Sequence, residues 1–188
     1  FGAACTSIRS LRESNDKSVR ESHFDHTLTN SVRHGGNIPA IWARSAGRET
    51  CLLGLSWADE AQLILTLPES GVRNVKDLHG RRFGLPKWAN VQIDFTRAQA
   101  LRGLENALQL EGLSVNEVEL VDFVIDAGYS DAPASNEGGV SLFGGRSGGH
   151  NDELLGLLRG EVDAVFLKGA SAVQLAHQLD LVTVIDTG

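Results

Sequence analysis

The chain has 188 residues, of which 41% are apolar, and its formal net charge is -7. This length is typical of one domain, or of one domain with part of a second, and the apolar content is enough for a proper core. The negative charge gives no support to a nucleic-acid partner, which needs a basic surface, and no apolar run reaches the roughly 18 residues of a membrane span. The chain starts at Phe1 and contains no methionine, so we expect its natural N-terminus to lie upstream.

The first third of the chain mixes apolar and polar stretches. Arg9–Arg20 is charged, and we expect the end of a strand and a loop there. Asn37–Ala43 is predicted to begin a helix with Pro39 in its first turn, where a missing N–H has no cost. Two short apolar runs, Cys51–Leu55 and Ala61–Leu67, predict buried strands.

The middle of the chain carries clear helix and strand signals. Val75–Leu78 is predicted to be a short helical turn. Arg82–Leu85 begins a strand that we expect Pro86 to end, because proline removes a backbone donor. Asn90–Glu111 is predicted to be a helix, since its apolar residues recur at spacings of three and four and Gly112 provides a C-terminal stop.

The rest of the chain continues the alternation of strands and helices. We predict a strand at 118–125, a long loop at 128–150, a helix at 153–159, a strand at 162–167, a helix at 171–179 and a strand at 182–185. This alternation predicts a mostly parallel sheet with helices on both faces, whose ligands bind outside the carboxyl ends of the strands. The loop is rich in Gly, Ser and Asn and is predicted to be a mobile lid. Within the long helix, Gly103 is expected to cost about 1 kcal/mol relative to Ala.

The best candidate for an anion site is Arg33-His-Gly-Gly36, directly before the predicted helix start. The glycines allow a ligand to approach the backbone closely, and unpaired N–H groups at a helix N-terminus favour a negative charge. Arg33 adds a fork that fits two oxygens of a sulfinate, sulfonate or carboxylate. The alternative is a surface arginine beside an ordinary glycine turn.

Other motifs are less specific. His23-Phe-Asp-His26 would need a third ligand from elsewhere to hold a metal, so we expect no metal site there but a polar loop with one functional histidine. Gly138–Gly149 lacks the G-x-G-x-x-G spacing of a dinucleotide site and is expected to belong to the lid. The adjacent arginines of Gly80–Gly84 are expected to be solvated. We expect both cysteines to be free thiols, Cys51 as a buried small hydrophobe and Cys5 without any distinguishing feature.

Two segments, Val75–Leu85 and Gly160–Val165, resemble the type II solute-binding proteins of nitrate, taurine and sulfonate transporters. This resemblance implies an α/β fold of the type II periplasmic-binding-protein kind, with two lobes, mostly parallel sheets and an incomplete first lobe. The "G-x-V-D-A" signature in the second segment precedes a strand that lines the cleft in that family. We expect residues 1–78 to form part of the first lobe and residues 79–188 the second.

A more specific likeness lies in His23-Phe24 followed by Arg33-x-Gly-Gly36-x-Ile38-Pro39, which is similar to the aromatic sulfinate desulfinases of dibenzothiophene desulfurisation. The resemblance implies that His23 is the active-site histidine and that the Arg33 side chain and the Gly36 N–H hold the sulfinate oxygens. It places the nucleophilic cysteine upstream of Phe1, so Cys5 does not match it. His34 and Asn37 replace a phenylalanine and an acidic residue, which indicates a different active-site wall.

The sequence therefore supports two functional hypotheses for one site made of His23, Arg33, Gly35 and Gly36. The first is a desulfinase, without cofactor or metal and located in the cytoplasm, that cleaves the C–S bond of an aryl sulfinate and releases sulfite. The alternative is a periplasmic or lipid-anchored binding protein that delivers a small organic sulfur oxyanion to a transporter partner. A transcription-regulator effector domain is a third interpretation, which would require an upstream helix-turn-helix.

Overall fold

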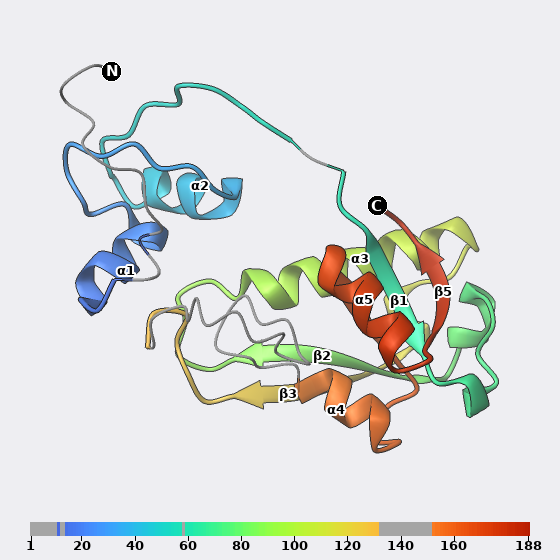
Figure 1. Ribbon diagram of the computed structural model, residues 1–188. Coiled ribbons are helices and arrows are strands. Elements are labelled where there is room, and N and C mark those ends of the chain that lie inside the picture. The colour runs from blue at the N-terminus through green and yellow to red at the C-terminus, as the bar shows by residue number, and fades with distance from the viewer. Residues whose placement is uncertain (1–10, 12–13, 58, 132–151) are drawn as a thin grey trace. The chain divides into compact units, whose positions relative to one another are not determined.

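The computed structural model describes residues 11, 14–57, 59–131 and 152–188 (Figure 1). Contacts divide these residues into two compact units, and the chain crosses from the first to the second after Ser56 and returns after Ala127. The first unit comprises the described residues up to 56 together with 128–131, and the second comprises the rest. No helix in the described ranges is long and apolar enough to span a membrane.

The first unit contains two nine-residue helices, α1 (Lys17–Asp25) and α2 (Asn37–Ser45). The helix α1 begins at Asp16, whose carboxylate accepts a hydrogen bond of 2.8 Å from the N–H of Ser18. It ends at His26, which has left-handed backbone angles (φ 57°). Our expectation of a strand end and a loop over residues 9–20 was therefore wrong for residues 17–20, which are helical.

The segment Cys51–Leu55, predicted to be a buried strand, has no strand pairing among the described residues. Its leucines are largely exposed, with 72% of Leu52, 70% of Leu53 and 77% of Leu55 accessible to solvent. Cys51 is an exposed free thiol, so its predicted burial was also wrong. An apolar run forms a strand only when a neighbouring strand pairs with it, and the run itself does not show whether that neighbour exists.

The second unit is built on one five-stranded sheet with the strand order β3-β2-β4-β1-β5. The strands are β1 (Gln62–Thr66), β2 (Arg82–Trp88), β3 (Glu119–Ile125), β4 (Ala164–Lys168) and β5 (Val182–Asp186). The α-helices are α3 (Phe95–Leu110), α4 (Asp152–Leu158) and α5 (Ala170–Gln178). Short 3-10 turns lie at Pro68–Ser70, Val75–Leu78 and Val115–Glu117.

The sheet is mixed. The strand β2 runs parallel to both β3 and β4, as the alternation of strands and helices predicted. The strand β1 lies between β4 and β5 and is antiparallel to both. The strand β1 thus shares its sheet with β4 and β5, and the described residues from 57 to 127 belong to one contact-based unit. The division into two lobes near residue 78 stays a prediction.

Helices cover both faces of this sheet, as predicted (Figure 1). The helix α3 packs on the face that carries Phe83, Leu85 and Phe166, whereas α4 and α5 pack on the opposite face. A Cβ atom on Gly103 of α3 would lie 2.2 Å from the ring of Phe166. Gly103, which we expected to weaken the helix, therefore allows α3 to pack closely on the sheet.

Pro86 lies within β2 and does not end it, which corrects our prediction. Residues of β2 point their backbone groups alternately to the two neighbouring strands: the carbonyl of Arg82 accepts from Asp163 on the β4 side, and Ala89 donates to Ile125 on the β3 side. This alternation directs Pro86 toward β4, whose pairing with β2 stops at Gly84. The missing N–H therefore interrupts no ladder.

Candidate functional site

The structure brings His23 and Arg33 into contact within the first unit. His23 lies in the last turn of α1, and the chain then folds back so that the Nε–H of Arg33 donates to the His23 carbonyl oxygen at 2.6 Å. The Nη2 atom of Arg33 lies 3.4 Å from the Nε2 atom of His23. Because a guanidinium only donates, a hydrogen bond across this contact would use the Nε2 lone pair of His23.

The two glycines lie where the sequence predicted them, directly before α2. Gly36 caps the helix, and the Nη1 atom of Arg33 donates to its carbonyl oxygen at 3.1 Å. No side chain in the described part of the chain caps this helix end. The guanidinium lies against Gly35, because a Cβ atom there would be 2.6 Å from Nη2. The three contacts of Arg33 leave at least two of its five N–H groups for a ligand, close to the N-terminus of α2.

Burial shapes the electrostatics around this arginine. It lowers the pKa of Arg33 below its usual value, yet the guanidinium remains the charged group at neutral pH. Burial also lowers the pKa of His26, and the nearby positive charge of Arg33 adds to this effect. The Nε2 atom of His26 is buried and has no hydrogen-bond partner among the described residues. Both effects favour a neutral His26, so Arg33 supplies the positive charge here.

The nearby polar groups do not form a metal site. No group of three or more His, Cys, Asp and Glu side chains that could hold a metal occurs in the described part of the chain. The Nε2 atom of His34 lies 3.1 Å from the hydroxyl of Ser56. Cys5 and the segment Gly138–Gly149 lie outside the described residues, as does most of the predicted lid.

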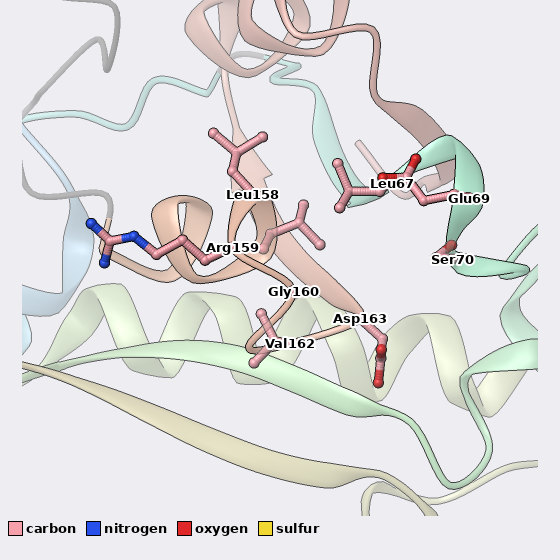
Figure 2. Close-up of a pocket in the computed structure, with 9 residues that line it drawn as sticks. Leu67, Glu69, Ser70, Leu158, Arg159, Gly160, Val162 and Asp163 are labelled. Atoms are coloured by element: carbon pink, nitrogen blue, oxygen red, sulfur yellow. The ribbon is translucent and has the colours of Figure 1, made fainter.

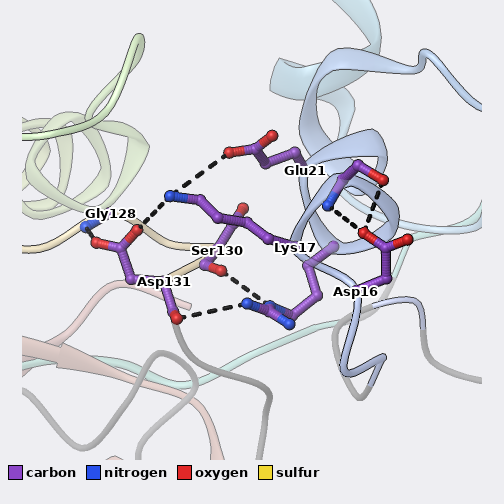
Figure 3. Close-up of polar contacts among 8 residues, drawn as sticks. Asp16, Lys17, Glu21, Gly128, Ser130 and Asp131 are labelled. Atoms are coloured by element: carbon purple, nitrogen blue, oxygen red, sulfur yellow. Dashed lines mark hydrogen bonds and ion pairs between the residues drawn. The ribbon is translucent and has the colours of Figure 1, made fainter.

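A second set of residues, which could not be predicted from the sequence, holds Gly128–Asp131 against α1 (Figure 3). Arg20 is 5% exposed, and its Nε–H donates to the Ser130 carbonyl oxygen at 2.8 Å. Lys17 forms an ion pair of 2.9 Å with Asp131, whose carboxylate also accepts from the N–H of Gly128. The N-cap signal Asp16-x-Ser18 could have revealed α1, but nothing in the local sequence points to residue 130.

A cavity of about 340 Å³ in the second unit lies away from the carboxyl ends of the parallel strands (Figure 2). Its lining comes from two stretches before β4 and after β1: Leu67, Glu69, Ser70, Leu157, Leu158, Arg159, Gly160, Val162 and Asp163. The side chain of Arg159 points away from the other labelled residues in Figure 2. Glu69 and the C-terminal end of α4 both oppose an anion, so this cavity does not suit a sulfur oxyanion.

The sequence motifs around Arg82 and Asp163 have a structural role. The Asp163 carboxylate accepts from the Nη2 atom of Arg82 at 2.9 Å, from its Nε at 3.2 Å and from its backbone N–H at 2.9 Å. The side-chain hydrogen bond from Arg82 is the main reason why the pKa of Asp163 lies below its usual value. The "G-x-V-D-A" aspartate therefore fastens the start of β4 to the start of β2.

No protein-family model and no curated protein matches the chain. Among solved structures, it is similar to a cysteine-to-serine mutant of DszB in complex with biphenyl-2-sulfinic acid, with 23% identity and a TM-score of 0.61 over 90% of this chain and 55% of that one. The periplasmic aliphatic sulphonate-binding protein SsuA from Escherichia coli is 18% identical, with a TM-score of 0.47 over 80% of this chain and 38% of that one. The alkanesulfonate-binding protein SsuA from Xanthomonas axonopodis pv. citri, bound to MOPS, is 20% identical, with a TM-score of 0.44 over 80% of this chain and 41% of that one.

The similarity to DszB defines the class of fold: an α/β fold of the periplasmic-binding-protein kind, represented here by the mixed sheet of the second unit together with the first unit. The chain spans about half the length of DszB and about two fifths of the length of the two SsuA structures. The fold class agrees with the sequence-based expectation. The roles of His23, Arg33, Gly35 and Gly36 as site residues remain predictions.

Proposed function

We propose that this chain carries the anion-binding site of a cofactor-free, desulfinase-like enzyme that cleaves the C–S bond of an aryl sulfinate and releases sulfite. The observation that carries the proposal is the convergence of His23 and Gly36 on the guanidinium of Arg33. A half-buried, charged fork beside a helix N-terminus whose cap residue is a glycine suits an oxyanion with two oxygens. The similarity to a structure solved with biphenyl-2-sulfinic acid supports the choice of sulfur oxyanion.

The proposed reaction converts an aryl sulfinate and water into the arene and hydrogen sulfite. A proton is delivered to the ring carbon, the electron pair of the C–S bond stays with that carbon, and the sulfur leaves as sulfur dioxide that takes up water. Arg33 and the Gly36 N–H hold the two oxygens and stabilise the charge that they carry, as preorganised donors do. His23 orients or tunes a cysteine thiol that we place upstream of Phe1, and no metal takes part.

The test of the anion site is calorimetric titration of the protein with biphenyl-2-sulfinate. Arg33→Ala should weaken binding by about 1.5–3 kcal/mol, the scale of hydrogen bonds to a charged group, and Arg33→Lys should restore little because lysine lacks the fork. Arg44 of α2 provides the matched control, since its Nη1 atom is bound only loosely, at 3.4 Å, to the carbonyls of Arg48 and Thr50. Equal affinity of the Arg33→Ala and wild-type proteins would remove Arg33 from the site.

Catalysis is tested by sulfite release from the same sulfinate in the full-length protein. His23→Ala should lower the rate by about 10²-fold or more, the usual scale of acid–base assistance. Cys5→Ser and Cys51→Ser should leave the rate within a few-fold of wild type, because we assign the catalytic thiol to neither. Loss of turnover in folded Cys5→Ser would contradict the proposed assignment of His23 and Arg33.

A binding protein for a sulfonate-like solute is the second candidate. It needs the same anion site but no reacting thiol, because the guanidinium of Arg33 beside the N-terminus of α2 suits the oxygens of a sulfonate as well as those of a sulfinate. Sulfinate or sulfonate binding without any sulfite release from the full-length protein would support this candidate. We place the enzyme in the cytoplasm and the binding protein outside it, with a transporter as partner.

A further inference from the structure

Gly128–Asp131 contacts α1 through one stripe of that helix. Lys17 and Arg20 bind Asp131 and Ser130, and Phe24 lies one turn further along the same face, because positions separated by three and seven residues align on a helix. The Phe24 ring stacks on the ring of Tyr129, with centroids 5.4 Å apart and an interplanar angle of 28°. Three side chains of α1 therefore fix the four-residue segment.

The same aromatic stack reaches the site. The ring of His23 meets the Phe24 ring edge-on, with centroids 4.9 Å apart and an interplanar angle of 89°. The Nε2 atom of the same imidazole lies 3.4 Å from the Nη2 atom of Arg33. Tyr129, Phe24, His23 and Arg33 thus form one contact chain, and Tyr129 is the member furthest from the anion site.

We infer that Tyr129 is a positioning residue for His23: its ring holds Phe24 in place, and Phe24 sets the orientation of the imidazole toward Arg33. Lys17, Arg20 and Asp131 keep Tyr129 in register with α1. Only the significance of His23 for the ligand rests on the proposed function, since the contact chain itself is a property of the fold. Aromatic pairs favour specific ring arrangements, so the Phe24–Tyr129 stack restricts the orientation of the Phe24 ring that contacts His23.

The direct test uses the Hε1 resonance of His23 in the full chain, assigned with His23→Gln. Tyr129→Ala should shift this resonance, whereas Tyr129→Phe, which keeps the ring, should match wild type. Asp131→Asn should reproduce part of the shift without changing any aromatic residue, which covers the case in which Tyr129→Ala does not fold. Glu111→Gln breaks a comparable exposed ion pair with Lys76 (3.3 Å) in the second unit and should leave His23 unchanged.

An unchanged His23 resonance in folded Tyr129→Ala, or an equal effect of Tyr129→Phe, would overturn the inference. A second readout is the affinity for biphenyl-2-sulfinate, which should fall by about 3-fold to 10-fold in Tyr129→Ala, matching the strength of one aromatic pair. If neither the wild type nor any variant binds the sulfinate, but the His23 resonance responds to Tyr129→Ala, the proposed function fails and the positioning role stands. If Arg33-dependent binding is present but His23 ignores Tyr129, only the positioning role fails.

Discussion

The guanidinium of Arg33 lies where a side chain on Gly35 would have to be: a Cβ atom at residue 35 would come within 2.6 Å of Nη2 and 2.9 Å of Cζ. Residue 35 must therefore lack a side chain for the guanidinium to lie here, and this requirement does not depend on its backbone angles. Gly36 differs from its neighbour, because a Cβ atom there would meet nothing within 4 Å.

This difference predicts opposite results for two similar substitutions. Gly35→Ala should displace the Arg33 side chain and shift the NMR signal of its Nε–H, which donates to His23. Global stability should change little, because the clashing atoms are the far end of a flexible side chain. Gly36→Ala, at φ -57°, should leave this signal in place. A shifted signal in both variants, or in neither, would contradict the close packing of Arg33 on Gly35.

A second prediction concerns Glu153 in the first turn of α4. This residue is 5% exposed, its Oε2 atom has no hydrogen-bond partner among the described residues, and burial raises its pKa to about 7. Since the pKa in the folded state lies above the ordinary value of 4.5, its contribution to stability is fully present below about pH 4.5 and is lost as the pH rises through about 7.

Glu153→Gln should therefore match wild type near about pH 4.5 and be more stable near about pH 8, by up to about 3 kcal/mol. Urea unfolding of both proteins across this pH range measures the difference. Asp152→Asn is the control, because Asp152 is the neighbouring carboxylate and is less buried. A stability difference that stays constant with pH would mean that Glu153 does not titrate in this range.

A third prediction reverses the usual helix preference at Gly103. Alanine is intrinsically better than glycine in a helix interior by about 1 kcal/mol, but overpacking a core costs about 1–3 kcal/mol. The 2.2 Å approach of the Phe166 ring favours the second effect, so Gly103→Ala should lower the free energy of unfolding. Adding Phe166→Leu should recover part of the loss, giving a coupling energy of about 1 kcal/mol.

The exposed Asn106 in the same helix provides the control for this comparison. Asn106→Ala adds an equally good helix former where no ring approaches, and it should raise stability by a few tenths of a kcal/mol, up to about 0.7. If Gly103→Ala also raised stability, the contact between α3 and β4 would be looser than the structure has it.

A fourth prediction separates the two adjacent arginines at the start of β2. Arg82→Ala should lower the urea midpoint of unfolding, because it removes both side-chain contacts to Asp163. Arg81→Ala should lower it less, and neither substitution should alter the affinity for biphenyl-2-sulfinate. A loss of sulfinate affinity in either variant would make this basic pair a candidate anion site.

The sequence predicted the helices and strands of the second unit well, because each is specified by residues that lie close together in the chain. Apolar periodicity and the stop at Gly112, where φ is 72°, placed α3 within a few residues, and the strands follow from their apolar runs. The antiparallel direction of β1 could not be predicted in this way, because strand direction depends on connections and on partners elsewhere in the chain. The charged helix α1 was missed because its apolar positions are too few to form a clear stripe.

The candidate site shows the same division between local and distant information. The resemblance to the sulfinate desulfinases implied that His23, Arg33 and the two glycines share one site, and the structure places them in contact, while their role in binding stays a prediction. The contribution of Tyr129 could not be predicted, since its partner Phe24 lies more than a hundred positions earlier and no periodicity links them. Gly103 was misinterpreted for a similar reason, because the ring that requires it belongs to β4.

The contact between Arg20 and Ser130 has a consequence for folding order. The two residues are 110 positions apart, and β2, α3 and β3 all lie between them in the chain. Closing such a long loop is entropically costly while it is disordered, and the cost falls once the intervening sheet has formed and shortened the path. We therefore expect α1 to complete its docking late, after the sheet, so that pulse-labelling hydrogen exchange protects the amides of β2 before those of α1.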